Sequence, residues 1–215
     1  MAGVATMTLK LEGTATLGAF TLNANIVADN EIIAITGANG VGKTTLLRVL
    51  AGLVKLTTGT LVVDNSVYDD ATTDSFVPAH QRQVSMVFQN ETLLPFLSVR
   101  DNIAFPLRMS RVSRTHAREL AQEAISIHAI SNLADLMPKD LSGGQAQRVA
   151  LVRAFICTPK IILLDEPLSA LDENARPELR KFLREKLTEI VGYKFVVTHD
   201  RQDVDQICDR EIHLN

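Results

Sequence analysis

Short apolar runs alternate along the chain with patterns of helical period. Three runs of six residues, rich in Ile, Leu, Val or Phe, predict buried strands. These runs are residues 31–36, 160–165 and 193–198. Between the last two, Leu179, Leu183, Leu187 and Ile190 recur every three or four residues and predict one face of a helix. Buried strands that alternate with helices are typical of a mostly parallel sheet covered on both faces.

Other segments predict two further parts of the fold. Short strands of a separate antiparallel part are predicted at residues 8–11, 20–25 and 60–63. Residues 84–88 predict another strand, which Gln89 follows, and residues 44–53 predict a helix. The chain is therefore predicted to be an α/β protein with a parallel-sheet core and an N-terminal antiparallel β part.

The stretch at about residues 98–139 predicts an inserted helical lobe. Ser98 and Asp101 resemble a capping box, with Asp in the usual Glu place. An amphipathic helix is predicted at residues 113–130, with Leu120, Ala124 and Ile127 on one face.

Composition suits a single large domain. The chain has 215 residues, of which 46% are hydrophobic, enough for a sizeable core. We predict one domain over residues 1–215, with the catalytic core at residues 1–97 and 140–215. The 22 basic and 25 acidic residues give a formal net charge of −3. This balance argues against a general nucleic-acid binder, because such proteins usually carry a basic surplus.

The chain has no pattern of membrane insertion or export. No run of 18 apolar residues occurs, so we expect no membrane-spanning segment. Residues 1–20 lack a basic start followed by a long apolar stretch, so we expect no secretory signal. Cys157 and Cys208 stand far apart in no ligand-spaced pattern, which predicts two buried thiols in a reducing cytosol.

A phosphate-binding loop is the first chemical motif. Its residues are Gly37, Ala38, Asn39, Gly40, Val41, Gly42, Lys43 and Thr44, which fit G-x-x-x-x-G-K-[ST]. Backbone N–H groups of such a turn point at an anion, and the positive end of the following helix dipole faces the same anion. By this pattern Lys43 reaches the β- and γ-phosphates of a nucleotide, and the Thr44 hydroxyl binds Mg²⁺.

Two adjacent carboxylates end the apolar run at residues 160–165. Asp165 is predicted at the C-terminal end of a parallel strand, where open α/β sheets bind ligands. We expect Asp165 to hold Mg²⁺, directly or through water, and Glu166 to polarise the attacking water. Because two carboxylates beside a triphosphate repel each other, the site needs a cation.

Two polar residues follow other predicted strands. Gln89 is a candidate contact for Mg²⁺ or the attacking water, and His199 is a candidate contact for the γ-phosphate. Taken alone, such residues more often lie on the surface or pack against neighbours. The phosphate loop and the carboxylate pair favour the catalytic interpretation.

A second anion site is predicted at another helix start. Its residues are Ser142, Gly143, Gly144 and Gln145, and the helix runs to about residue 156. A single chain does not need two such sites. The economical interpretation is a head-to-tail homodimer, in which the Ser142 site of one copy caps the γ-phosphate held by Lys43 of the other.

These motifs, in this order, resemble the ATP-binding subunit of an ABC (ATP-binding cassette) transporter, which is a P-loop NTPase. In that family the motifs are the Walker A loop (residues 37–45, ending at Thr45), the Q-loop Gln89, the signature (residues 141–145), Walker B (residues 161–165), the D-loop (Ser169, Ala170, Leu171 and Asp172) and the switch His199. The resemblance covers nearly the whole chain. It implies ATP and Mg²⁺ as cofactors, and an ATPase whose catalytic residues are Glu166, His199 and Gln89.

The resemblance also implies partners and a location. The implied partners are integral membrane permease subunits and, indirectly, an extracytoplasmic substrate-binding protein, with no nucleic acid. The implied location is the cytoplasmic face of the cell membrane, where the chain is a peripheral subunit. In this family the helical lobe forms a groove for a cytoplasmic helix of the permease. Within residues 90–96, Leu94, Pro95 and Phe96 are then exposed apolar contacts; the equally weighted alternative is that they belong to the core of the lobe.

The chain departs from the family pattern in two places. Family members usually stack an aromatic side chain on adenine from a position that here holds residues 16–19, and Phe20 is the nearest aromatic. The chain also stops at Asn215, where many relatives continue into a regulatory domain, so no such control is expected in this chain.

The cargo is the least determined property. Residues 16–23 and 77–84 resemble the ATPases of molybdate and related oxyanion importers, whereas the region of Gln89 and the signature is shared with thiamine importers. A separate-subunit exporter is a further alternative. An ATPase acting on DNA or ribosomes is less favoured, because the interval between the two phosphate-binding motifs is short and shows no heptad pattern.

Overall fold

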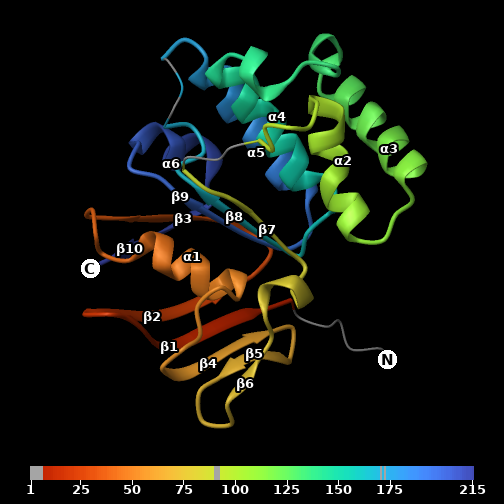
Figure 1. Cartoon of the computed structure of the whole chain (residues 1–215). Helices are drawn as coiled ribbons and strands as arrows, with labels where there is room; N and C mark the ends of the chain where they lie inside the picture. Colours follow the sequence, from red (N-terminus) through yellow and green to blue (C-terminus); the bar gives the residue numbers. More distant parts are fainter. Residues whose placement is uncertain (1–6, 90–92, 170, 172) are drawn as a thin grey trace, which may run out of the picture.

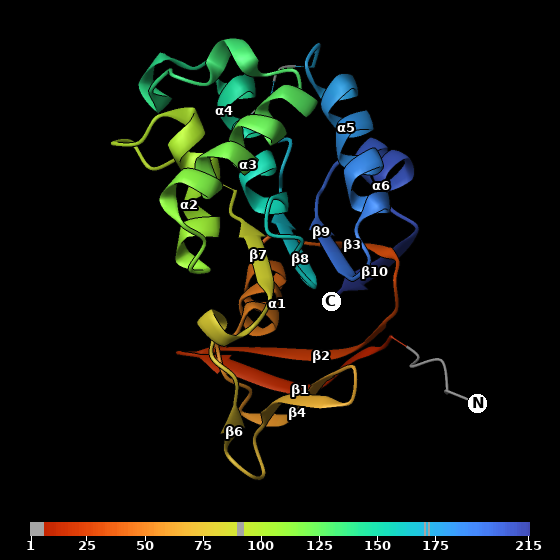
Figure 2. The same cartoon turned by 90° about the vertical axis from the view of Figure 1, so that its right-hand side faces the viewer.

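The computed structural model describes residues 7–89, 93–169, 171 and 173–215. Its elements form layers around a central parallel sheet (Figure 1, Figure 2). Helices cover one face of this sheet, and a single helix followed by an antiparallel sheet covers the other. The predicted α/β class, with a parallel core, an antiparallel part and helices, is confirmed.

Five strands form the parallel sheet in the order β10-β3-β9-β8-β7. They are β3 (Ile32–Gly37), β7 (Val84–Val87), β8 (Ile161–Asp165), β9 (Tyr193–Val197) and β10 (Arg210–Leu214). Every neighbouring pair in this order runs parallel. The C-terminal ends of all five strands therefore meet at the same edge of the sheet.

The antiparallel sheet has the order β2-β1-β4-β5-β6. Its strands are β1 (Leu9–Leu17), β2 (Phe20–Ala28), β4 (Thr58–Val63), β5 (Ser66–Asp70) and β6 (Ser75–Phe76). Helix α1 (Lys43–Ala51) lies between the two sheets, with contacts to β2 on one side and to β3, β7, β8 and β9 on the other (Figure 2). This helix is the one that follows the phosphate loop, so both sheets fix its position.

The remaining helices cover the opposite face of the parallel sheet. They are α2 (Val99–Met109), α3 (Arg114–Ile127), α4 (Gly143–Phe155), α5 (Arg176–Glu189) and α6 (Arg201–Ile207). Helix α2 packs against both α3 and α4, and α4 packs against β7. The boundaries drawn between a core and a helical subdomain stay a prediction. Among the described residues, no helix is long and apolar enough to cross a bilayer.

The central strands are buried on both faces, and successive residues enter different cores. On β8, Ile162 and Leu164 pack with the helices α2 to α5. Ile161 and Leu163 pack with α1 and the antiparallel sheet. This two-sided burial explains why the runs are continuously apolar rather than alternating.

Arg82 fixes the C-terminal end of α1. Its buried guanidinium donates to the carbonyls of Val49 and Leu50 at 2.8 Å, where a cation also meets the negative end of the helix dipole. Burial lowers the pKa of Arg82 to about 10, which still leaves it charged at neutral pH. The helix predicted at residues 44–53 ends earlier because Gly52, with φ of 75°, turns the chain where a Cβ would lie 2.6 Å from Arg82 Nε.

The inserted helices differ from their prediction in detail. Ser98 caps α2 by accepting the N–H of Asp101 at 3.2 Å. The Asp101 carboxylate instead accepts two hydrogen bonds from Arg118 of α3, each 2.7 Å long, and Arg118 holds the pKa of that carboxyl below its ordinary value. Only half of the expected capping box forms, because the carboxylate joins α2 to α3.

The buried face of α3 is not the predicted one. The fully buried residues are Ala117, Ala121 and Ile125. Leu120 and Ala124 are only partly buried, and Ile127 is 65% exposed. Small alanines let α3 approach α2 closely, so the helix presents the alanine face rather than the larger side chains.

Both thiols are partly buried rather than fully buried as expected. Burial raises the pKa of Cys157 and raises the pKa of Cys208 to about 12, so both stay protonated at neutral pH. Three strands, β5, β6 and β10, were not predicted from the sequence. In β10 only Leu214 is buried, so pairing with β3 rather than an apolar run holds this strand.

Candidate nucleotide site

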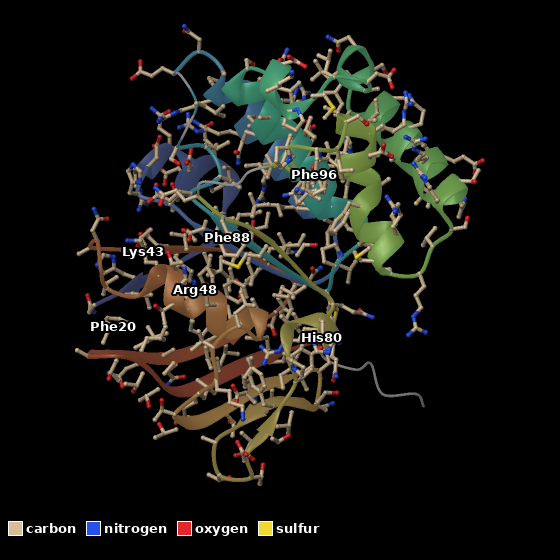
Figure 3. The ribbon with its side chains drawn as sticks, in the orientation of Figure 1. Phe20, Lys43, Arg48, His80, Phe88 and Phe96 are labelled. Carbon is tan, nitrogen blue, oxygen red and sulfur yellow. The ribbon has the colours of Figure 1, made fainter. Side chains whose placement is uncertain are left out.

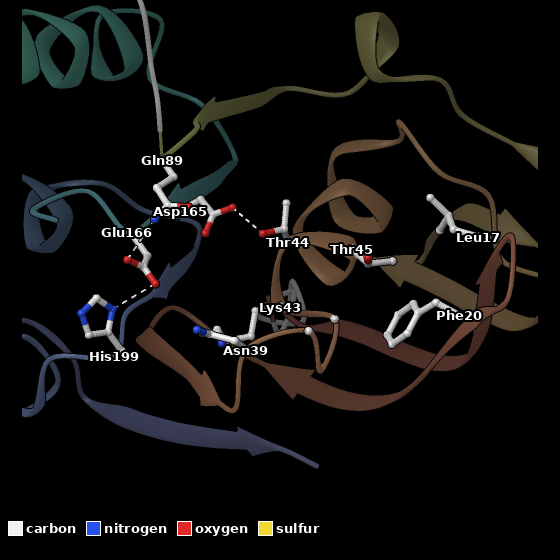
Figure 4. A pocket seen from close by; sticks show the side chains of 12 residues that line it. Leu17, Phe20, Asn39, Lys43, Thr44, Thr45, Gln89, Asp165, Glu166 and His199 are labelled. Carbon is white, nitrogen blue, oxygen red and sulfur yellow. Dashed lines mark hydrogen bonds and ion pairs between the residues drawn. The ribbon is translucent and has the colours of Figure 1, made fainter. Parts of the chain in front are cut away.

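A cavity of about 760 Å³ lies at the C-terminal edge of the parallel sheet (Figure 4). The residues that line it are Leu17, Phe20, Asn39, Gly40, Gly42, Lys43, Thr44, Thr45, Gln89, Asp165, Glu166 and His199. They come from the ends of four parallel strands or the loops that follow, from the first turn of α1, and from the β1–β2 hairpin. Residues from distant parts of the sequence are thus brought together because parallel strands end at one edge.

The phosphate loop takes a backbone path that requires glycine. Gly37 and Gly42 have φ of 139° and 105°. A Cβ on Gly37 would lie 2.5 Å from the carbonyl oxygen of Leu214, and one on Gly42 would lie 2.7 Å from the Phe20 ring. No side chain caps the N-terminus of α1 at Gly42, so the N–H groups of its first turn are left to an anion.

Lys43 is buried and folds back over its own loop. Its Nζ donates to the carbonyl oxygens of Gly37 at 2.8 Å and Ala38 at 2.9 Å. The positive charge is therefore held inside the loop that is predicted to receive phosphate. Gly37, Ala38 and Val41 do not line the cavity themselves; the first two hold Lys43 through their carbonyls.

Thr44 and Asp165 form the candidate metal position. The Thr44 hydroxyl donates to Asp165 Oδ2 at 2.8 Å (Figure 4). Burial raises the pKa of Asp165, and the neighbouring charge of Glu166 adds to the rise, although the Thr44 hydrogen bond opposes it. A hydroxyl and a buried carboxylate with an unfavourable negative charge are oxygen donors that fit Mg²⁺, with nucleotide and water oxygens completing the shell.

Glu166 is held between the two other predicted catalytic residues. His199 Nδ1 lies 3.0 Å from Glu166 Oε1, and Gln89 Nε2 lies 3.3 Å from Glu166 Oε2 (Figure 4). The backbone of Glu166 has φ of 48°, a conformation that non-glycine residues seldom adopt. Its N–H donates to Val197 of β9 at 2.9 Å and so keeps the ladder between β8 and β9. The left-handed turn thus begins immediately after the buried strand.

Leu17 and Phe20 lie at the far end of the cavity from His199 (Figure 4). They are the closing pair of the β1–β2 hairpin, whose two-residue turn contains Gly18 with φ of 58°. The sequence left the adenine contact open and offered Phe20 only as the nearest aromatic. The hairpin places Phe20 on the cavity together with Leu17, which lies within the residues 16–19 that hold the family position.

The second predicted anion site lies elsewhere on the molecule. Ser142, Gly144 and Gln145 line a separate cavity of about 310 Å³. Ser142 and Gln145 form a reciprocal capping box, with the Gln145 N–H donating to Ser142 Oγ at 3.3 Å. One of the N–H groups expected to be free is therefore engaged. Gly143 is exposed beside Ser142 at the helix start.

Two predicted family residues, Ala170 and Asp172 of the D-loop, lie outside the described residues, as do residues 90–92. Ser169 is described, and its hydroxyl donates to the carbonyl of Glu166 at 3.0 Å. Leu171 lines the cavity beside Ser142. The segment after Glu166 therefore runs from the first cavity towards the second.

Comparison with known proteins agrees with this geometry. A family model described as "ABC transporter" matches residues 22–169. The Fe(3+) ions import ATP-binding protein FbpC of Agrobacterium fabrum is 39% identical over 201 residues, which make up 92% of this chain and 55% of that protein. The spermidine/putrescine import ATP-binding protein PotA of Bacillus cereus is 37% identical over 190 residues, 88% of this chain and 56% of that protein. The chain thus spans about half the length of these curated relatives.

A solved structure gives the same picture of the fold. It is a dimeric post-hydrolysis state of the ATP-binding cassette MJ0796 bound to ADP and Pi, with a TM-score of 0.79 and 30% sequence identity. The match covers 96% of this chain and 94% of that chain.

Asp165→Asn tests the electrostatics of the carboxylate in the candidate metal position. A carboxyl with a raised pKa contributes stability below its unfolded pKa and loses it as pH rises through the folded pKa. Without Mg²⁺ and nucleotide, the Asn variant should therefore melt at a higher temperature than the unsubstituted protein at pH 7.5, and the difference should shrink as pH falls towards 4. A gain of ~1 kcal/mol corresponds to about 2–4 °C.

The control is Asp74→Asn, because Asp74 is exposed and forms an ion pair with the exposed Lys55. Its melting temperature should hardly change. Scanning calorimetry in the presence of EDTA measures the melting temperatures of both variants. In a separate titration with Mg²⁺, the affinity for ATP should fall only in Asp165→Asn. A lower melting temperature for Asp165→Asn at pH 7.5 would contradict the electrostatic interpretation.

Proposed function

Because this chain belongs to the ABC transporter family as one of its ATP-binding domains, we propose that it hydrolyses ATP and couples hydrolysis to solute import through separate membrane subunits. One observation carries the hydrolytic part of the proposal. Glu166 lies between Gln89 and His199, in the same cavity as Lys43 and the Thr44–Asp165 pair. The candidate general base, the candidate cation position and the phosphate loop thus line the same cavity.

Each residue has a defined task in the proposed reaction. Lys43 exchanges its two carbonyl acceptors for oxygens of the β- and γ-phosphates. Thr44 and Asp165 would hold Mg²⁺, which would supply charge stabilisation for the transferring phosphoryl group. Glu166 accepts a proton from the attacking water, with its carboxylate oriented by Gln89 and His199. Phe20 stacks against the adenine at the other end of the cavity.

The proposed active form is a head-to-tail homodimer. Within one chain, Ser142 and Lys43 line different cavities, so the Ser142 helix start does not serve the phosphate loop of its own chain. Ser142 and Gly143 are exposed, as a surface for a second copy requires. The dimeric assembly of the related cassette supports this arrangement.

The proposed permease contact consists of exposed apolar residues on both sides of Gln89 in the sequence. Phe96 is 72% exposed, Phe88 is 38% exposed and Pro95 is also exposed, whereas Leu94 is partly buried. Figure 3 shows Phe88 near the end of β7, Arg48 on α1 and Phe96 among the helices. Exposed apolar groups near Gln89 favour the docking alternative over the lobe-core alternative for residues 95 and 96. We place the subunit on the cytoplasmic face of the membrane, with an extracytoplasmic binding protein as an indirect partner.

Import is favoured over export because both curated relatives are import proteins. An ATPase acting on DNA or ribosomes is less favoured. The helices between the two anion sites include α2 and α3 of 11 and 14 residues, too short for a long coiled-coil arm. We therefore expect no nucleic-acid partner.

Glu166→Gln tests the hydrolytic mechanism. The amide keeps the size of the side chain but cannot accept the proton, so turnover should fall by roughly 10²–10⁴-fold while ATP affinity is kept. Steady-state phosphate release and calorimetric titration with MgATP measure the two quantities. A variant that turns over at the unchanged rate would remove Glu166 from this role.

Ser142→Arg tests the dimer. A long charged side chain at the exposed helix start should prevent a second copy from closing, and binding of ATP to the monomer should stay within about twofold of the unsubstituted value. Sedimentation in the Glu166→Gln background reveals the ATP-dependent dimer. Ser66→Arg is the control and should dimerise normally, because Ser66 is an exposed residue of β5 and lines neither cavity. Normal ATP-dependent dimers of the Ser142→Arg variant would contradict the proposed head-to-tail homodimer.

An oxyanion such as molybdate is the cargo we propose, on the resemblance of residues 16–23 and 77–84. Iron and polyamines, named for the relatives, and thiamine are the alternatives. In vesicles that carry the chain with its permease and binding protein, molybdate should stimulate ATP hydrolysis several-fold at micromolar concentration. Stimulation by Fe³⁺, spermidine or thiamine, and not by molybdate, would contradict the proposed cargo and identify the stimulating solute in its place.

A further inference from the structure

Arg180 of α5 is a buried arginine with three partners in the segment after β9. The residue is 4% exposed. Its Nε donates to Asp203 Oδ1 at 2.6 Å, and one Nη donates to Asp200 Oδ2 at 2.7 Å. The other Nη donates to Gln202 Oε1 at 2.7 Å. A single planar guanidinium therefore fixes several residues at the start of α6, which packs beside α5 (Figure 1).

The same network encloses the backbone on both sides of His199. Thr198 Oγ1 donates to Asp203 Oδ2 at 3.0 Å and accepts the N–H of Asp200 at 3.1 Å. Asp200 in turn caps α6 by accepting the N–H of Gln202. Both chain neighbours of His199 are thus bonded to residues that Arg180 holds.

His199 itself has little other support. Its side chain is 68% exposed, and within the described part of the chain its polar contact is with Glu166, at 3.0 Å. Packing does not hold an imidazole that is so exposed. The direction of the side chain therefore depends on the position of the backbone at residue 199. That backbone position is set by the Arg180 network.

A second arginine joins this network to the segment after Glu166. Arg176, one turn before Arg180, donates to the carbonyl of Leu171 at 3.1 Å and to Asp200 Oδ2 at 3.3 Å. Asp200 is therefore shared by both arginines. The guanidinium of Arg176 therefore links the segment that runs from Glu166 towards the Ser142 cavity to Asp200, which directly follows His199.

We propose that Arg180 is a positioning residue for His199, which it holds in reach of Glu166 and of the γ-phosphate through Asp200 and Asp203. This proposal rests on the proposed function of the cavity. Arg180 touches neither the phosphate loop nor the residues assigned to Mg²⁺ within the described part of the chain. Its replacement should therefore slow hydrolysis and leave nucleotide affinity unchanged.

Arg180→Lys is the main test, because lysine keeps the charge and loses the fork that bonds three partners at once. We expect kcat for ATP hydrolysis to fall by roughly 10–100-fold, since displacing a catalytic group by about 1 Å has effects of this order. The Kd for MgATP, measured by calorimetry, should stay within about twofold. The matched control is Arg184→Lys on the next turn of α5, where the guanidinium contacts Asp209 and Ile207 instead. The control should keep kcat.

The His199→Ala background separates positioning from a general loss of structure. If Arg180 acts through His199, Arg180→Lys should lower kcat less than twofold further in that background. Equal losses of kcat in both backgrounds, or a Kd that weakens together with kcat, would overturn the positioning role and leave the proposed function standing. A His199→Ala variant with unchanged kcat would instead overturn the role of His199 itself, and the positioning proposal with it.

Asp200→Asn covers the case in which Arg180→Lys does not fold, as shown by its melting curve. Asparagine still accepts the N–H of Gln202 as a helix cap and weakens both arginine pairs. The same pattern is expected, with kcat lowered, Kd kept and no further loss in the His199→Ala background. A normal kcat for a folded Asp200→Asn variant would overturn the proposal.

Discussion

The burial of both faces of the parallel sheet is the constraint on which the nucleotide site depends. Ile161 and Leu163 of β8 enter one core, and Ile162 and Leu164 enter the other. A shift of this strand by one residue would exchange these sets between two cores of different shape. The register is therefore fixed, and with it the point at which Asp165 emerges at the edge of the sheet. The neighbouring strands fix Gln89 and His199 in the same way.

Buried arginines position the segments that the strands do not reach. Arg82 binds the carbonyls at the C-terminal end of α1, and the phosphate loop lies at the other end of that helix. Arg180 binds the start of α6, and His199 lies just before it. In both places a guanidinium satisfies several acceptors at once, as buried polar groups require. The two sides of the cavity are thereby tied to the rigid layers of the fold.

The cavity holds two features that are unfavourable in isolation. Asp165 has a raised pKa because it is buried near Glu166, and Glu166 has a left-handed backbone. Both lie where a cation and a triphosphate are proposed to bind. A bound cation would stabilise the negative charge of Asp165. The left-handed backbone of Glu166 directs its carboxylate into the cavity. Features of this kind are maintained by the surrounding structure and are commonly found at functional sites.

The two helix starts that are proposed to bind anions lie apart in the fold. Lys43 and Ser142 lie at the N-terminal ends of α1 and α4, which belong to different layers of the molecule. Each helix packs through its apolar face, so neither can move to the other without unpacking a core. In the proposed homodimer, a second copy of the chain would supply the Ser142 site without such a cost.

The sequence by itself determined the buried strands, the phosphate loop and the order of the motifs, because these depend on local periodicity and on residue types at short spacing. It also placed Asp165 and Glu166 at a strand end. The face that α3 buries, the strand β10 and the place of Phe20 on the cavity depended on contacts between distant segments, which local pattern does not encode. The role of Arg180 could not be predicted from the sequence for the same reason. Its partners stand 20 to 23 positions away in the sequence, and only the packing of α5 beside α6 brings them within hydrogen-bond distance.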